Sequence, residues 1–156
     1  MEQNYKIRIG NESDFAAVLG MIKELAIFEK AENKVTNTVE KMIQDQAHFE
    51  LFIVENNGET VAMALYYFTY FTWVGKSLYL DDLYVKPEHR GKGIGQDLLK
   101  EIFKIAQKEN CNRVRWQVLD WNTNAVDLYT KIGATLDAEW LNCDFDKKGI
   151  LEFKID

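Results

Sequence analysis

The chain has 156 residues, of which 47% are hydrophobic and 28% charged, a length and balance that suit one globular domain with a real core. Its 19 basic and 25 acidic side chains give a net charge of −6, which argues against a general nucleic-acid binder because phosphate neutralisation needs a basic face. The sequence shows no apolar run of membrane-spanning length, no leader segment, and only two cysteines without a metal-binding spacing, so we expect a soluble, cytoplasmic, metal-free protein.

In the first half of the chain, residues 5–9 alternate between apolar and polar, and residues 49–55 and 60–70 are apolar and rich in strand-forming side chains. Two other segments follow helical patterns. These runs predict strands at 5–9, 49–55 and 60–70 and helices at about 15–26 and 38–46. Asn11 and Ser13 are the candidate N-caps of the first helix, and the turn Asn56-Asn57-Gly58 is a strong hairpin signal between the last two strands.

The second half alternates between strand and helix patterns. It predicts strands at 77–85 and 113–118, helices at about 94–110 and 124–132, and two final strands between about 140 and 154 that turn at 147–149. Gly133 stands where a left-handed residue commonly ends a helix. No linker, repeat or low-complexity segment interrupts the chain, so residues 1–156 are expected to form a single α/β domain.

The charges are unevenly distributed. Residues 83–115 carry 8 basic and 4 acidic side chains, whereas residues 1–60 carry 11 acidic and 6 basic ones and residues 116–156 carry 8 acidic and 4 basic ones. The basic stretch suits a polyanionic ligand, and the acidic flanks suit a cation.

The basic stretch contains the turn Arg90-Gly91-Lys92-Gly93-Ile94-Gly95, which follows a predicted strand and opens a predicted helix. Alternate glycines let backbone N–H groups face inward, and a helix N-terminus adds free donors, so the turn predicts an anion site rather than a simple helix cap. It lacks the lysine–hydroxyl ending of the nucleoside triphosphate loop, and Gln96 occupies the place of the small residue of the dinucleotide fingerprint.

The pattern Arg90-x-x-Gly93-x-Gly95 after a strand resembles the pyrophosphate-binding motif of the GNAT superfamily of acetyl-coenzyme A-dependent N-acetyltransferases. The resemblance extends over nearly the whole chain. Similarity to the diamine branch, which holds the spermidine/spermine and thialysine N-acetyltransferases, rests on segments 22–26, 66–70, 79–85 and 118–122. It implies a GNAT-like fold: a mixed, mostly antiparallel central sheet flanked by helices.

The resemblance also implies which residues hold acetyl-coenzyme A. The backbone of Leu83, Tyr84 and Val85 would pair with the pantetheine arm, and Asn122, Ala125 and Tyr129 would make further contacts. The pyrophosphate would lie on the turn formed by Arg90, Gly91, Lys92, Gly93, Ile94, Gly95 and Gln96.

Two residues carry the expected chemistry. Tyr129 matches the family's general acid, and Asp81 stands where the polyamine enzymes usually have a glutamate, so it is the candidate base, acting directly or through water. The shorter aspartate reduces its reach. Asp82 points to the opposite face of the strand if that strand is regular.

The implied substrate is a small cationic amine: a diamine, a polyamine or a thialysine- or lysine-like compound. By resemblance it would contact Glu29, Trp73, Asp81, Glu139 and Trp140. Phe71 and Thr72 replace an acidic-Pro pair typical of the spermine-preferring enzymes, which favours a shorter or lysine-like amine. The alternatives are acetylation of a protein or peptide amine and a non-catalytic acetyl-coenzyme A-binding module. The family usually forms homodimers, and neither nucleic acid nor membrane is an expected partner.

Overall fold

The computed structural model describes residues 4–154 and divides into two compact units, with the boundary between Gln117 and Val118. The first unit contains β1 (Tyr5–Ile9), α1 (Phe15–Phe28), α2 (Val39–Gln44), β2 (Glu50–Asn56), β3 (Glu59–Phe71), β4 (Gly75–Val85), α3 (Ile94–Lys108) and β5 (Val114–Arg115). The second contains α4 (Thr123–Lys131) and α5 (Lys147–Glu152). Short 3-10 turns occur at Glu12–Asp14, Glu32–Lys34, Gln46–His48 and Pro87–His89.

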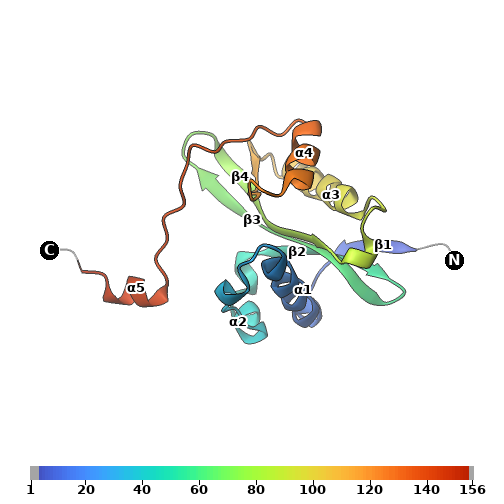
Figure 1. The fold of residues 1–156 in the computed structure, drawn as a ribbon, viewed down its shortest axis with the longest axis horizontal. Helices are drawn as coiled ribbons and strands as arrows, with labels where there is room; N and C mark the ends of the chain where they lie inside the picture. The colour runs from blue at the N-terminus through green and yellow to red at the C-terminus, as the bar shows by residue number, and fades with distance from the viewer. Residues whose placement is uncertain (1–3, 155–156) are drawn as a thin grey trace. The chain divides into compact units, whose positions relative to one another are not determined.

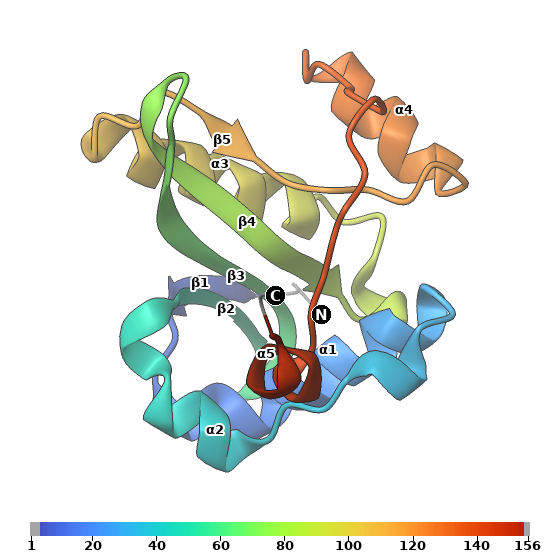
Figure 2. The same ribbon diagram turned by 90° about the vertical axis from the view of Figure 1, so that its left-hand side faces the viewer.

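The first unit is built on a five-stranded sheet in the order β1-β2-β3-β4-β5. All neighbouring strands are antiparallel except β4 and β5, which run parallel. Helices α1 and α2 lie on one face of this sheet and α3 lies on the other, while the β3–β4 hairpin extends beyond α1 and α2 (Figures 1 and 2). The predicted fold class, a mostly antiparallel sheet flanked by helices, is confirmed.

The main core fills the space between α1, α2 and the sheet. Its buried members are Phe15, Val18, Leu19, Met21, Met42, Leu51, Ile53, Met63, Leu65 and Tyr84. The α1 residues recur at helical spacing and the strand residues at every second position, which is why the apolar pattern located both kinds of element. On the opposite face, Ile94, Leu98 and Ile102 of α3 are buried.

The first helix is fixed by polar side chains at its start. The side chain of Asn11 accepts a hydrogen bond from the Ser13 N–H, and the Asp14 carboxylate accepts one from the Asn11 N–H, so Asn11 is the N-cap of the 3-10 turn Glu12–Asp14 that leads into α1. Arg8 of β1 donates to both oxygens of Asp14 at 2.7 Å and to Glu55 of β2 at 2.6 Å. One guanidinium therefore links two strands to the start of α1.

Several local predictions hold. The turn between β2 and β3 places Asn57 and Gly58 at φ 53° and 83°, the left-handed pair that a two-residue hairpin requires. Gly133 ends α4 with φ 94°.

Two strand predictions are wrong. The strand expected at 113–118 is only Val114–Arg115, and its pairing ends at Tyr79, just before β4 becomes irregular. The two strands expected between 140 and 154 do not form in the described residues, and α5 occupies 147–152 instead. The Asp146 side chain accepts a hydrogen bond from the Gly149 N–H at 2.7 Å, and this local cap stabilises a helical turn without a partner strand.

Within residues 4–154, no helix combines the length and the apolar character that a membrane span requires. No group of His, Cys, Asp and Glu side chains in the same range is arranged to hold a metal ion.

Replacing Asp14 by asparagine is expected to lower the free energy of unfolding by about 1–3 kcal/mol near neutral pH, because charge-assisted hydrogen bonds at a mostly buried carboxylate are lost. The hydrogen bonds from Arg8 lower the pKa of Asp14. Its contribution is therefore complete above the aspartate pKa of the unfolded chain, about 4, and disappears as the pH falls through the lower folded value. Urea titrations of both proteins at about pH 7 and pH 2 measure the difference, with exposed Glu12→Gln as the control. An equal difference at both pH values would contradict this account.

Candidate active site

The centre of the first unit's sheet contains an irregularity at Asp81. Leu65 pairs with Asp82, but the next residue of β3, Tyr66, pairs with Leu80, so Asp81 is an extra residue in β4. Such a β-bulge reverses the alternation of side chains between the two faces. Asp82 and Leu80 therefore do not share a face, although they are two residues apart.

The bulge changes the expected orientation of the two aspartates. Asp82 lies opposite Leu65, a member of the core beneath α1, and so belongs to the α1 face. Burial, and after it the negative charge of Asp81, raises the pKa of the Tyr67 and Tyr79 phenols, so Asp81 lies on the side of the strand that these two rings occupy. The strand is not regular, and the expectation that Asp81 and Asp82 point to opposite faces does not apply.

Three carboxylates form an acidic cluster on this face. Loss of surrounding water, followed by the negative charges of Asp81 and then Glu29, raises the pKa of Asp82 to about 7. Desolvation also raises the pKa of Asp81 and of Glu29, although both side chains keep exposed surface. The cluster therefore holds a proton more readily than isolated carboxylates do, and its negative charge attracts a cation.

Glu29 reaches this cluster from the end of α1. It is the C-cap residue, and Lys30 after it adopts a left-handed conformation with φ 58°. The Lys30 and Ala31 N–H groups donate to the carbonyls of Ile27 and Ala26, a Schellman arrangement that fixes where the helix stops.

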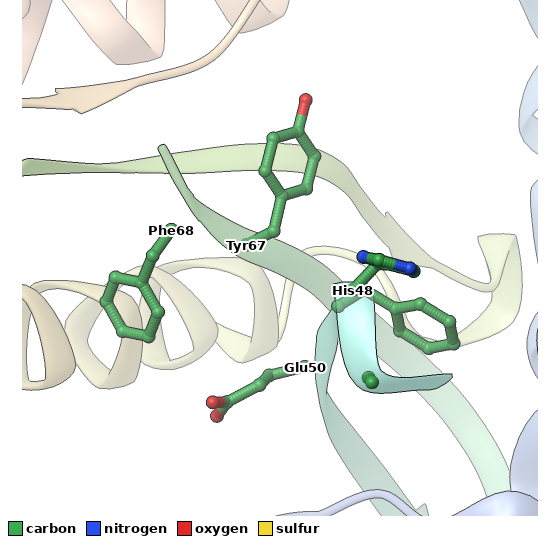
Figure 3. A pocket seen from close by; sticks show the side chains of 6 residues that line it. His48, Glu50, Tyr67 and Phe68 are labelled. Atoms are coloured by element: carbon green, nitrogen blue, oxygen red, sulfur yellow. The ribbon is translucent and has the colours of Figure 1, made fainter. Parts of the chain in front are cut away.

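Aromatic rings border the carboxylates. Tyr67 and Tyr79, opposite each other on β3 and β4, stack with ring centroids 5.3 Å apart. Tyr67 also lines a hollow of about 230 Å³ where β3 continues past the start of β2, together with Ala47, His48, Phe49, Glu50 and Phe68. Figure 3 shows the Tyr67 and Glu50 side chains leaving the sheet in opposite directions. Acidic and aromatic groups together suit an organic cation.

The glycine turn follows β4 and the 3-10 turn Pro87–His89. Gly91 and Gly93 have φ of 73° and 83°, and a Cβ built on either would meet no atom within 4 Å. A Cβ on Gly95 would lie in ordinary contact with Leu83 and Val85 at 3.7 and 3.8 Å. Gly93 is the N-cap of α3 and provides no side-chain cap, so the first-turn N–H groups of the helix are available for an anion.

The end of β4 has an open edge. Because β5 pairs with β4 only at Leu78 and Tyr79, no strand among residues 4–154 pairs with that edge from Asp81 to Val85. The Nε of Arg90 donates to the Val85 carbonyl at 2.8 Å, and its guanidinium lies 5.4 Å from the centre of the Tyr84 ring. The Tyr84 hydroxyl donates to Glu24 of α1 at 2.9 Å. These contacts connect the glycine turn to α1 through the strand.

The second unit carries the other predicted residues. Asn122 is the N-cap position of α4, and its carbonyl accepts hydrogen bonds from the Ala125 and Val126 N–H groups. Tyr129 lies in the last turn of the helix, where its carbonyl accepts from the Ala134 N–H, and burial raises the pKa of its phenol. A phenol with a raised pKa keeps its proton at neutral pH, as a general acid must.

Sequence comparison identifies the family. Residues 20–134 match the Acetyltransferase (GNAT) family, a range that includes the bulge, the glycine turn and α4. The chain belongs to this family. It is therefore an enzyme of the acyltransferase class.

Individual relatives agree with the family match. A thialysine N-epsilon-acetyltransferase of Mus musculus is 37% identical over 162 residues, covering 94% of this chain and 95% of the relative. Human spermidine/spermine N(1)-acetyltransferase-like protein 1 is 34% identical over 162 residues, which is 95% of this chain but 23% of that longer protein. A predicted acetyltransferase from Clostridium acetobutylicum, solved with acetyl-CoA, has a TM-score of 0.73 at 19% identity, covering 90% of this chain and 96% of that one.

Within this GNAT protein, the predicted substrate residues divide between the two units. Glu29 and Asp81 belong to one cluster, whereas Trp73 lies at the tip of the β3–β4 hairpin with 81% of its surface exposed. Glu139 and Trp140 lie outside helix and strand in the second unit, and the Glu139 N–H donates to Asp137.

Sequence reasoning missed Tyr67, Tyr79 and the position of Asp82. Apolar residues that face α3 occupy Leu78 and Leu80 before the bulge and Leu83 and Val85 after it. The apolar positions of this strand therefore change from even to odd residue numbers, and this change is the sequence signal that could have indicated the bulge.

The carboxylate cluster generates a prediction about titration. The Asp82 carboxyl is expected to titrate at about 7. Asp81→Asn and Glu29→Gln each remove a neighbouring negative charge and lower that midpoint, Asp81→Asn by the larger amount. Carboxyl ¹³C NMR titration measures it, with Glu101→Gln on α3 as the control.

The same shift has a consequence for stability. Because the folded pKa of Asp82 lies above that of an unfolded chain, its favourable contribution is present at low pH and is lost as the pH rises through about 7. Asp82→Asn should therefore raise the melting temperature at about pH 8 but not at about pH 4. An increase of equal size at both pH values would refute the assignment.

Proposed function

We propose that this GNAT protein transfers an acetyl group from acetyl-coenzyme A to a primary amine of a small cationic substrate: a diamine, a polyamine or a thialysine- or lysine-like compound. The observation that carries the proposal is the carboxylate cluster of Asp81, Asp82 and Glu29, bordered by stacked tyrosines on the same sheet that leads into the glycine turn. The thialysine and polyamine names of the relatives support the same substrate class.

The residues after the bulge fit the coenzyme. The unpaired edge at Leu83 and Val85 suits backbone pairing with an amide-containing arm, and the turn from Gly91 to Gln96 suits a pyrophosphate. The Val85 carbonyl already accepts one hydrogen bond, from Arg90. When bound, acetyl-coenzyme A would supply an acetyl group activated as a thioester.

The acidic cluster would prepare the amine. An alkylammonium has a pKa near 10.4 and is not nucleophilic until it loses a proton. Asp81 or Asp82 would accept that proton, directly or through water, and the raised pKa of both carboxylates makes them better bases than ordinary aspartates. Glu29 would hold the ammonium by charge.

The proton for the departing sulfur would come from the second unit. The Tyr129 hydroxyl is the proposed donor, and Asn122 and Ala125 at the start of the same helix are proposed coenzyme contacts. The reaction therefore draws on residues of both units, and we propose that residues 1–156 act as one acetyltransferase domain. The family match, which crosses the boundary between the units, supports this. Homodimerisation and a cytoplasmic location remain predictions.

One assay tests the proposal against its alternatives. Thiol release from acetyl-coenzyme A is measured with thialysine, lysine, ornithine, putrescine, spermidine and peptides carrying a free lysine or α-amine. Rapid release with the small amines supports the proposal. Release with peptides alone would indicate a protein acetyltransferase, and coenzyme binding without release on any amine would indicate a binding module.

The glycine turn provides a test of coenzyme binding. Gly93→Val places a branched side chain on a left-handed residue and into the open space of the proposed pyrophosphate site, so the coenzyme Kd should rise at least tenfold. Isothermal titration with coenzyme A measures it. Gly20→Ala in α1, where a Cβ also meets nothing within 4 Å, is the matched control and should bind normally. Unchanged affinity in Gly93→Val would exclude the turn as the anion site.

The acid assignment has its own test. Tyr129→Phe removes the proton donor but little volume, so kcat should fall about a hundredfold while the coenzyme Kd stays within about twofold. Steady-state kinetics and coenzyme titration separate these effects, with Tyr70→Phe on the exposed face of the hairpin as the control. A kcat equal to that of the unmodified enzyme would remove Tyr129 from the mechanism.

A further inference from the structure

We propose that the side chains of Glu24 and Tyr84 are positioning groups for the coenzyme: together they hold the Arg90 guanidinium at the end of β4, ready to bind the pyrophosphate of acetyl-coenzyme A. This inference rests on the proposed function, which puts the pyrophosphate on the glycine turn. It gives a role to two side chains that lie outside that turn.

The side chain of Tyr84 is fixed at both ends. Its ring belongs to the core beneath α1 and is 5% exposed, and its hydroxyl donates a hydrogen bond to the Glu24 carboxylate of α1 at 2.9 Å. A buried phenol without an acceptor leaves a polar group unsatisfied, which is costly. The bond to Glu24 therefore restricts the ring to one orientation.

Arg90 is held by the same strand in two ways. Its guanidinium carbon lies 5.4 Å from the centre of the Tyr84 ring, and its Nε donates to the Val85 carbonyl at 2.8 Å. The bond to Val85 uses Nε and not the two terminal nitrogens, which form the fork that binds phosphate oxygens. The orientation of this fork thus depends on the position of the Tyr84 ring.

The Tyr84 phenol responds to both of its charged neighbours. Its pKa is raised by burial first, then by the hydrogen bond and the negative charge of Glu24, and it is lowered by the positive charge of Arg90. Within residues 4–154, no salt bridge includes either Glu24 or Arg90. A direct bridge between the two would occupy the guanidinium fork. Because the carboxylate binds the phenol instead, the positive charge is kept for a phosphate.

Holding Arg90 in advance favours coenzyme binding. An arginine side chain has many rotamers, and fixing one of them when a ligand binds costs conformational entropy. That cost is smaller where the protein has already fixed the side chain. Loss of the bond between Glu24 and Tyr84 should therefore weaken coenzyme affinity. It should not slow the chemical step, since neither side chain touches the reacting atoms in the proposed mechanism.

The experiment is a calorimetric titration of coenzyme A into variants of the full chain. Glu24→Ala and Tyr84→Phe each remove the hydrogen bond and should raise the coenzyme Kd about threefold to tenfold, the usual effect of releasing one rotamer-rich side chain. Steady-state kinetics should show a higher KM for acetyl-coenzyme A in Glu24→Ala without a fall in kcat. Glu24→Gln keeps an acceptor for the hydroxyl and should restore part of the affinity.

Tyr66 provides a matched control. It is buried in the same sheet with 2% exposure, and its hydroxyl donates to the Glu50 carboxylate at 2.9 Å, so Tyr66→Phe removes the same kind of bond at another place. The melting temperature should fall by a similar amount in Tyr66→Phe and in Tyr84→Phe. Only Tyr84→Phe should weaken coenzyme binding.

A double variant separates the positioning of Arg90 from a general disturbance of the core. If Tyr84 acts through Arg90, Tyr84→Phe should raise the Kd by less than about twofold in a protein that already carries Arg90→Gln. Equal effects with and without Arg90→Gln, or unchanged affinity in Glu24→Ala, would overturn the inference and leave the glycine turn as the coenzyme site. Failure of the unmodified enzyme to bind coenzyme A would refute the proposed function and this inference together.

Discussion

The β-bulge at Asp81 is the constraint on which the arrangement of the first unit depends. One additional residue in β4 lets Leu80 and Leu83 both face α3 while Asp82 and Tyr84 face α1. Without it, an unbroken alternation from Leu80 would place Asp82 on the face toward α3, among apolar residues, where an unpaired charge is costly. The bulge also coincides with the end of the β4–β5 pairing, and so leaves the last part of β4 with an unpaired edge. The acidic cluster, the open edge and the glycine turn therefore follow one another along β4 and the loop that comes after it.

The electrostatic design follows from this geometry. The net charge of −6 does not describe how the charges are distributed, because the acidic and the basic functional groups occupy different regions. Carboxylates gather around Asp82, where burial and mutual repulsion favour retention of a proton. The Arg90 guanidinium and a helix N-terminus lie at the glycine turn. Each region suits a different part of a reaction that joins a cation to a polyanionic acyl carrier.

Features that depend on neighbouring residues in sequence could be predicted. The Asn57-Gly58 turn, the Asn11 cap and the left-handed Gly133 each follow from the conformational preference of one or two side chains. The sheet class followed from hydrophobic periodicity. The GNAT family, and with it the glycine turn as a candidate site, was recognisable from the Arg90-x-x-Gly93-x-Gly95 spacing after a strand.

Features that depend on pairing between distant segments could not be predicted in the same way. The length of β5 is set by where β4 ceases to be regular, and the segment after residue 140 forms a capped helix although its residues alternate like a strand. The coupling of Glu29 to Asp82 joins residues from a helix end and a strand that are far apart in sequence. Roles for Asp81 and Tyr129 came from family resemblance, because an acidic pair and a helical tyrosine are by themselves common surface or core features.

The unpaired edge of β4 also bears on colloidal behaviour. An exposed strand edge is a template for pairing with another chain, and proteins usually protect such edges with charge or irregular backbone. Here both protections are present: Asp81 and Asp82 put charge at the bulge, and Arg90 occupies the Val85 carbonyl. The features that suit β4 to an amide-containing ligand therefore also discourage edge-to-edge aggregation. A substitution that neutralises these charges would increase the stability of the fold but lower the solubility of the protein.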